Sequence, residues 1–124
     1  MSGSAQAMEA NFRDQISSTT DAYQAARLGM SFDKSGQNDL ALLAFQKSTD
    51  LDPNYRDAWV MKGYEELKLS DNKTALESLK KAETLDTINP RTYELLAVAY
   101  RANGDDDSAK KAQEKFEYLN KTAK

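Results

Sequence analysis

Apolar residues recur along the chain at the three- and four-residue spacings of amphipathic helices. In residues 22–35, for example, Ala25, Leu28 and Phe32 fall on one helical face. No segment alternates between apolar and polar residues over the length of a strand. The hydrophobic pattern therefore predicts an all-α fold.

The same pattern repeats with a period of 34 residues. Four columns show the repeat most clearly: Ala41, Ala75 and Ala109; Leu51, Leu85 and Leu119; Gly29, Gly63 and Ala97; and Gly36, Ser70 and Gly104. Each period contains two amphipathic stretches separated by the last of these columns, where a turn is needed. The sequence thus predicts three helix-turn-helix units, at 22–55, 56–89 and 90–122, which together form one domain over residues 21–122.

Polar residues mark where several of these helices should begin. Asn38, Asn72 and Asp106 share one column after the turn, and each has a side chain that can accept a hydrogen bond from an orphan backbone N–H. Asn89 precedes Pro90, which is favoured at the first position of a helix. We therefore expect Asn38, Asn72, Asp106 and Asn89 to be N-caps.

Composition narrows the classes of function. The 124 residues carry 17 basic and 20 acidic side chains, a net charge of −3 without the basic surplus typical of nucleic-acid binders. The absence of cysteine and histidine removes thiolate sites, the commonest general base and the commonest transition-metal ligand. No apolar run is long enough to cross a membrane. We expect a cytoplasmic protein with no cofactor, no metal, no catalytic residues and no nucleic-acid partner. An alternative for its localisation is an exported protein whose signal peptide has been cleaved.

The three units resemble the tetratricopeptide repeat. That family has an aromatic residue, Leu-Gly and a second aromatic residue on the first helix, followed by Ala, Phe, Ala and Pro on the second. The first unit matches at Leu28, Gly29, Phe32, Ala41, Phe45 and Pro53. The second unit departs from the pattern at Lys62 and Glu66, where apolar residues are usual, and at Thr87, where proline is usual. The resemblance implies a right-handed α-solenoid that binds other proteins and has no catalytic activity.

The resemblance also implies which residues would face a partner. In such solenoids the first helix of each unit lines the concave face. The corresponding residues here are Tyr23, Arg27, Met30, Val60, Met61, Tyr64, Arg91, Leu95, Val98 and Arg101. An apolar centre with arginines at its edge suits a peptide or helix with an apolar face. Of the family's carboxylate-gripping positions only Arg91 has the right character, so a chaperone C-terminus is not expected. An alternative is that some of these residues pack between adjacent helices instead.

The segment before the repeats, residues 1–20, allows several interpretations. Three apolar residues have helical spacing, and two leucines occupy positions that are polar in the later units: Met8, Phe12, Ile16, Leu40 and Leu43. The segment is either a frayed tail or an extra capping helix that covers the leucines. A second hypothesis for the function, besides partner binding, is that the protein assembles with itself. In that case these five residues would join copies of the chain in a homo-oligomer. That the chain is a fragment of a larger protein also stays open.

Overall fold

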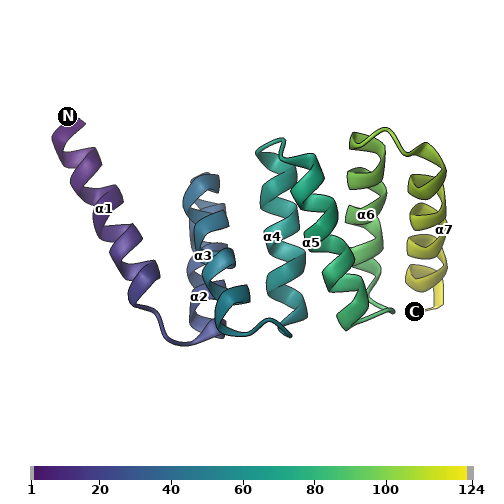
Figure 1. Cartoon of the computed structure of the whole chain (residues 1–124), viewed down its shortest axis with the longest axis horizontal. Coiled ribbons are helices and arrows are strands. Elements are labelled where there is room, and N and C mark those ends of the chain that lie inside the picture. The colour runs from purple at the N-terminus through teal and green to yellow at the C-terminus, as the bar shows by residue number, and fades with distance from the viewer. Residues whose placement is uncertain (1, 123–124) are drawn as a thin grey trace. The chain divides into compact units, whose positions relative to one another are not determined.

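The computed structural model describes residues 2–122, and seven helices with no strand make up this part of the chain (Figure 1). The helices are α1 (Ser2–Ser18), α2 (Ala22–Lys34), α3 (Asn38–Leu51), α4 (Arg56–Lys68), α5 (Asn72–Leu85), α6 (Pro90–Ala102) and α7 (Asp106–Thr122). Two compact units contain them, one formed by α1 to α3 and the other by α4 to α7. The prediction of an all-α fold with an additional N-terminal helix is confirmed.

Two consecutive helices pack as a hairpin in each repeat, and in the first two repeats glycine permits the close approach. A Cβ atom added at Gly63 of α4 would lie 2.6 Å from the side chain of Leu79 on α5. At the equivalent position of α2, a Cβ on Gly29 would lie 2.7 Å from the ring of Phe45. Phe45 and Leu79 are both fully buried. The small-residue column of the sequence is therefore a packing requirement of the hairpins.

Backbone with positive φ ends the first helix of every repeat. Gly36 has a φ of 75°, Ser70 of 63° and Gly104 of 80°, which confirms the predicted turn column. Glycine adopts this left-handed conformation without steric cost, but a side chain does not. Ser70 is therefore the strained member of the column.

Replacing Ser70 with glycine is expected to raise the free energy of unfolding by about 0.5–1 kcal/mol, because the relief of left-handed strain exceeds the added entropy of the unfolded chain. Urea unfolding followed by circular dichroism measures the change. Ser35 is a matched control, because it ends α2 with a φ of −84°. Ser35→Gly should give no gain, and an equal gain at both serines would contradict the assignment of strain to Ser70.

The N-cap positions lie one residue earlier than the sequence indicated. The first helical hydrogen bonds run from the N–H groups of residues 41, 75 and 109 to the carbonyls of Gln37, Asp71 and Asp105. Asn38, Asn72 and Asp106 are therefore the first residues inside their helices, and predicting them as N-caps was wrong. The side chains of Gln37 and Asp71 make no capping bond, whereas Asp105 accepts from the N–H of Ser108 at 3.1 Å.

At the start of α6 the predicted cap is confirmed. The side chain of Asn89 accepts a hydrogen bond from the N–H of Arg91 at 3.3 Å, and Pro90 is the first helical residue. Asn89 also donates to the hydroxyl of Thr92 at 3.1 Å. Together these bonds fix the point at which α6 begins.

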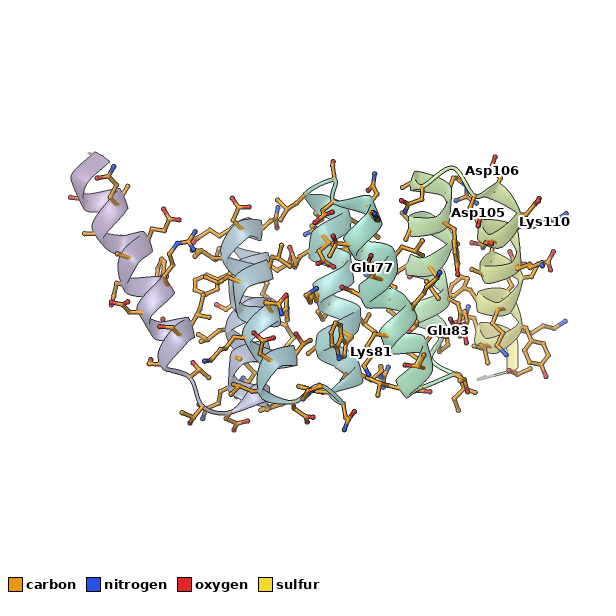
Figure 2. The ribbon with its side chains drawn as sticks, in the orientation of Figure 1. Glu77, Lys81, Glu83, Asp105, Asp106 and Lys110 are labelled. Atoms are coloured by element: carbon orange, nitrogen blue, oxygen red, sulfur yellow. The ribbon has the colours of Figure 1, made fainter. Side chains whose placement is uncertain are left out.

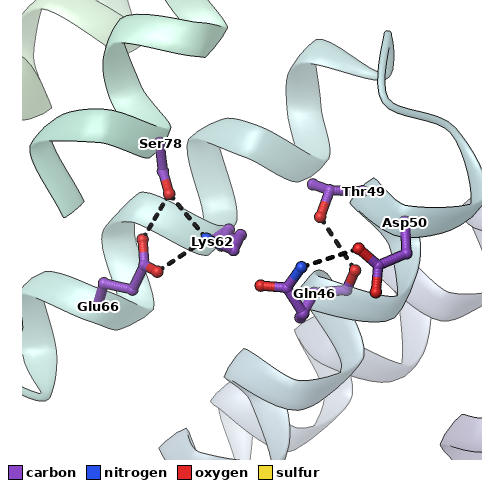
Figure 3. Close-up of polar contacts among 6 residues, drawn as sticks. All are labelled: Gln46, Thr49, Asp50, Lys62, Glu66 and Ser78. Carbon is purple, nitrogen blue, oxygen red and sulfur yellow. Dashed lines mark hydrogen bonds and ion pairs between the residues drawn. The ribbon is translucent and has the colours of Figure 1, made fainter. Parts of the chain in front are cut away.

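Lys62, Glu66 and Ser78 of the α4–α5 hairpin are buried and contact one another (Figure 3). The ammonium group of Lys62 lies 2.9 Å from Glu66 Oε2 and 3.0 Å from the hydroxyl of Ser78. That hydroxyl donates to Glu66 Oε1 at 2.6 Å. We call Lys62, Glu66 and Ser78 the polar triad. Each member of the triad forms a hydrogen bond or an ion pair with the other two. A buried ion pair requires such polar partners.

The polar triad explains why the second unit departs from the family pattern at Lys62 and Glu66. At the three positions of the triad, the first and third units carry apolar residues: Leu28 and Leu96, Phe32 and Tyr100, and Ala44 and Ala112. The three polar replacements therefore occur together, in residues that contact one another. The departure is one coordinated change of the hairpin interior.

α1 packs on the α2–α3 hairpin, and Phe12 and Ile16 of its apolar stripe take part in this packing. Phe12 makes an edge-to-face contact with Phe32, with ring centroids 5.2 Å apart. Ile16 is 2% exposed and lines a cavity with Leu43. Phe12 lines a second cavity with Leu40, which is itself buried.

This packing bears on the predicted self-association residues. The chain's own α1 covers Leu40 and Leu43, as the capping interpretation expected, and Ile16 is buried in the same contact. Of the five predicted residues only Met8 is largely exposed, at 59%. Self-assembly through all five would therefore require α1 to leave α3.

Candidate functional site

Neighbouring helices α4 and α6 present a mixed aromatic and cationic surface. Tyr64 lies at its centre, with the ammonium of Lys68 4.5 Å from the ring centroid and the guanidinium of Arg91 5.2 Å from it. Both distances are within the range of cation–π attraction. Arg91 also pairs with Glu94 at 2.6 Å, which holds its guanidinium in place.

Three further predicted residues share the helical faces of Tyr64 and Arg91. Met61 stands one turn before Tyr64 on α4, and Val98 and Arg101 stand two and three turns beyond Arg91 on α6. Met61 and Tyr64 are half-buried, whereas Val98 is 47% exposed and both arginines are exposed. We call Met61, Tyr64, Arg91, Val98 and Arg101 the α4–α6 surface.

Two residues predicted to line this surface belong to the core instead. Val60 is 4% exposed and Leu95 is 6% exposed, and both pack in one apolar cluster with Leu79 and Leu96. Their side chains fill the space between adjacent helices, the alternative that the sequence left open. The expectation that Val60 and Leu95 are accessible to a partner is therefore corrected.

The predicted residues of the first repeat lie on an exposed face of α2. Tyr23 is 57% exposed, Met30 is 42% exposed and Arg27 is exposed as well. Their spacing of four and three residues places them along one side of the helix. They belong to the unit formed by α1 to α3, whereas the α4–α6 surface belongs to the other unit.

Two charged side chains, one beside Tyr64 and one beside Arg91, were not among the predicted binding residues. Lys68 follows Tyr64 by four residues and Glu94 follows Arg91 by three, and residues at those spacings are neighbours on a helix. The spacing was therefore a usable signal. The contact between Arg91 and Tyr64 joins two helices and could not be derived from spacing alone.

Two features were searched for among the described residues, a metal-binding group and a membrane-spanning helix. Among them, no group of three or more acidic side chains is placed to hold a metal ion. No helix in residues 2–122 has the length and apolar character of a membrane span. The pKa of Asp105 is lowered because its carboxylate accepts hydrogen bonds from the side chain and backbone of Ser108. Such hydrogen bonds are typical of a residue that caps the start of a helix.

Tyr93 has a strongly shifted ionisation. Its pKa is raised from 10.0 to about 12, because burial disfavours the phenolate and the carboxylate of Glu83 lies close. Its hydroxyl donates to the carbonyl of Thr87 at 3.0 Å. The phenol therefore stays protonated in the folded protein at pH values where an exposed tyrosine ionises.

The shift predicts a pH dependence of stability. Above its ordinary pKa of 10.0, Tyr93 ionises in the unfolded chain first, so its contribution is complete below pH 10 and is lost as pH rises towards about 12. We expect the difference in unfolding free energy between the wild type and Tyr93→Phe to shrink through this window. Urea titrations at a series of pH values measure it, and a constant difference from pH 9 to 12 would contradict the shift.

The sequence profile of the tetratricopeptide repeat matches residues 25–55, 57–89 and 90–122. The chain belongs to the tetratricopeptide repeat family. The three matches end at the same residues as the three units predicted from the period. Tetratricopeptide repeats are generally non-catalytic modules that bind other proteins, and the fold alone does not specify the partner.

Solved structures of other tetratricopeptide repeat proteins share this fold. A crystal structure of MamA superposes with a TM-score of 0.79 at 20% identity, covering 94% of this chain and 73% of that one. MamA residues 41 to the end from Desulfovibrio magneticus RS-1 give 0.76 at 27% identity, covering 82% of this chain and 57% of that one. This chain thus spans little more than half of the latter.

The first tetratricopeptide repeat domain of Spaghetti (RPAP3), bound to the HSP90 peptide SRMEEVD, is a further structural relative. It gives a TM-score of 0.78 at 22% identity and covers 80% of this chain and 79% of that one. At such identities the likeness shows the shared fold. No match was found among curated protein sequences.

Proposed function

We propose that this protein is a non-catalytic scaffold that binds a segment of another protein at the α4–α6 surface. The observation that carries the proposal is Tyr64, a half-buried aromatic ring flanked by the cations of Lys68 and Arg91. Aromatic and arginine side chains of this kind dominate the binding energy of protein interfaces. Membership of a family of protein-binding modules supports the same function.

The partner's chemistry follows from the exposed parts of the surface. Met61 supplies a flexible apolar side chain and Val98 a branched one. Methionine adapts to irregular apolar shapes. Arg101 is exposed at the end of the face and can orient a polar flank of the ligand. An amphipathic helix or extended peptide with one apolar edge suits these residues.

The test begins with a random peptide library displayed on phage and selected against the full chain. Titration calorimetry then compares a selected peptide with the wild type and with the double variant Met61→Ala/Tyr64→Ala. We expect the Kd to rise at least about tenfold in the variant, because the central anchor of the surface is removed. Tyr118→Ala is the control, since Tyr118 is 63% exposed on α7, and it should leave the Kd unchanged.

A second variant keeps the test decisive if the first one unfolds. Val98→Asp places a charge on an exposed position of the same surface and leaves the core intact. It should also weaken binding by at least about tenfold. If peptides bind the double variant and Val98→Asp as tightly as the wild type, the α4–α6 surface is not the binding site.

A separate proposal concerns the unit of α1 to α3, in which a second binding face is formed by Tyr23, Arg27 and Met30. Their exposed face on α2 carries the same combination of aromatic, cationic and thioether side chains. Peptides selected against the full chain that lose affinity with Tyr23→Ala/Met30→Ala would assign a binding role to this face. If every selected peptide bound this double variant as tightly as the wild type, the α2 face would not be a binding site.

A further inference from the structure

The face of the α2–α3 hairpin that α1 covers is more apolar than the same face of the later repeats. Leu40 and Leu43 belong to it, together with the ring of Phe32. At the positions of the two leucines the later repeats have polar residues: Thr74, Glu77, Ser108 and Lys111. Glu77 is exposed on α5 (Figure 2). Phe32, Leu40 and Leu43 therefore form a face that needs an apolar cover, and we call it the α1 dock.

α1 is anchored to the dock by the second half of its length. Phe12 contacts Phe32 edge-to-face, and Ile16 is buried at a cavity that Leu43 also lines. Every residue from 3 to 11 is exposed. Two side chains of α1 thus provide most of its apolar contact.

Unfilled space lies on both sides of this anchor. Towards its N-terminus α1 diverges from α3 (Figure 1), and a cleft of about 390 Å³ lies between Met8 and Leu40. A cavity of about 150 Å³ adjoins Ile16 and Leu43. Elements that lack close packing open locally at little cost in free energy. We therefore expect α1 to detach from the dock more easily than α2 detaches from α3.

The junction between α1 and α2 lets the two helices move independently. The hydroxyl of Thr19 donates back to the carbonyl of Gln15 in α1 at 2.9 Å. Asp21 caps α2 by accepting from the N–H of Tyr23 at 2.9 Å. Thr20 stands between these two bonds, so α1 can swing about it while α2 keeps its cap. A short hinge beside a separable element favours exchange of that element between copies.

We propose that the α1 dock is an interface between copies of this chain, in which α1 of one copy leaves its own dock and packs on that of a second copy. The occupant follows from the closed form, because α1 is the segment that the chain itself shows to fit Phe32, Leu40 and Leu43. A second copy offers the same Phe12 and Ile16. The linker holds α1 near its own dock, so exchange grows with protein concentration.

The first test uses a capped, fluorescein-labelled peptide with the sequence of residues 2–20, titrated with the full chain while fluorescence anisotropy is measured. The full-chain variant Phe12→Ala/Ile16→Ala should bind this peptide at least about tenfold more tightly than the wild type, because its own α1 no longer competes for the dock. The same two substitutions in the peptide should abolish binding. Equal or weaker affinity of the full-chain variant, or no binding to either protein, would overturn the exchange.

The binding site is located in this full-chain variant, where competition from the chain's own α1 is absent. Adding Leu43→Glu gives the dock the residue that the second repeat has at this position, and it should weaken peptide binding at least about tenfold. Adding Val98→Asp instead changes an exposed residue of the α4–α6 surface and should leave the affinity unchanged. If Val98→Asp weakens binding and Leu43→Glu does not, the peptide binds at the α4–α6 surface and the dock is not an interface.

Disulfide trapping tests exchange between whole chains, which contain no native cysteine. Ile16 and Leu43 line one cavity, so a chain with Ile16→Cys is mixed with a chain with Leu43→Cys and oxidised. We expect mixed dimers in excess of random pairing, and the excess should grow with protein concentration. Random pairing at every concentration would overturn the exchange.

Discussion

Replacing Glu66 with leucine is expected to lower the free energy of unfolding by about 3–5 kcal/mol. The substitution leaves the ammonium of Lys62 inside the hairpin, where its side chain is 8% exposed, with Ser78 as its remaining partner in the triad. A buried charge without its counterion costs far more than the pair itself contributes. Urea unfolding monitored by circular dichroism at 222 nm measures the loss.

The matched variant removes the whole polar triad. Lys62→Leu/Glu66→Leu/Ser78→Ala gives the second repeat an apolar interior like that of the first and third repeats. Because no charge of the triad then remains buried, stability should return to the wild-type value or exceed it by about 1–4 kcal/mol. A triple variant as unstable as Glu66→Leu alone, or a single variant within about 1 kcal/mol of the wild type, would show that the triad is not the closed network described above.

The second large effect is expected at the glycine of the same hairpin. Gly63→Ala should destabilise the protein by about 1–3 kcal/mol, although alanine is the better helix former by about 1 kcal/mol. The added Cβ would meet the Leu79 side chain at 2.6 Å, and Leu79 is fully buried, so the two helices must move apart.

Gly3→Ala in α1 is the control for this prediction. A Cβ at Gly3 meets no atom within 4 Å, so the change in unfolding free energy should stay within about 0.5 kcal/mol. Thermal unfolding of both variants provides the comparison. If Gly63→Ala were neutral, the glycine column would reflect something other than hairpin packing.

Much of the fold could be predicted because the repeat places the same physical requirement at the same position three times. The turn at residues 36, 70 and 104 needs a left-handed residue in each unit, and two of the three are glycine. The N-caps were misplaced by one residue because both neighbouring positions are polar. Only the hydrogen bonds to the carbonyls of Gln37, Asp71 and Asp105 distinguish them.

The candidate site was predicted less completely. Repeat positions indicate which helix face a residue occupies, but burial depends on how closely the next helix packs against it. Val60 and Leu95 lie on the expected helices and are nevertheless covered. The triad shows the same limit, since Lys62 and Glu66 stood out in the sequence whereas Ser78 became visible only as their contact.

The central claim is that a partner peptide binds at the α4–α6 surface. Its most direct test is an amide chemical-shift titration of the full chain with a peptide selected from the phage library. We predict that the largest shifts fall on residues 61–68 of α4 and 91–101 of α6, and that Met61→Ala/Tyr64→Ala abolishes them. Shifts concentrated on α1, or on α7 alone, would contradict the account.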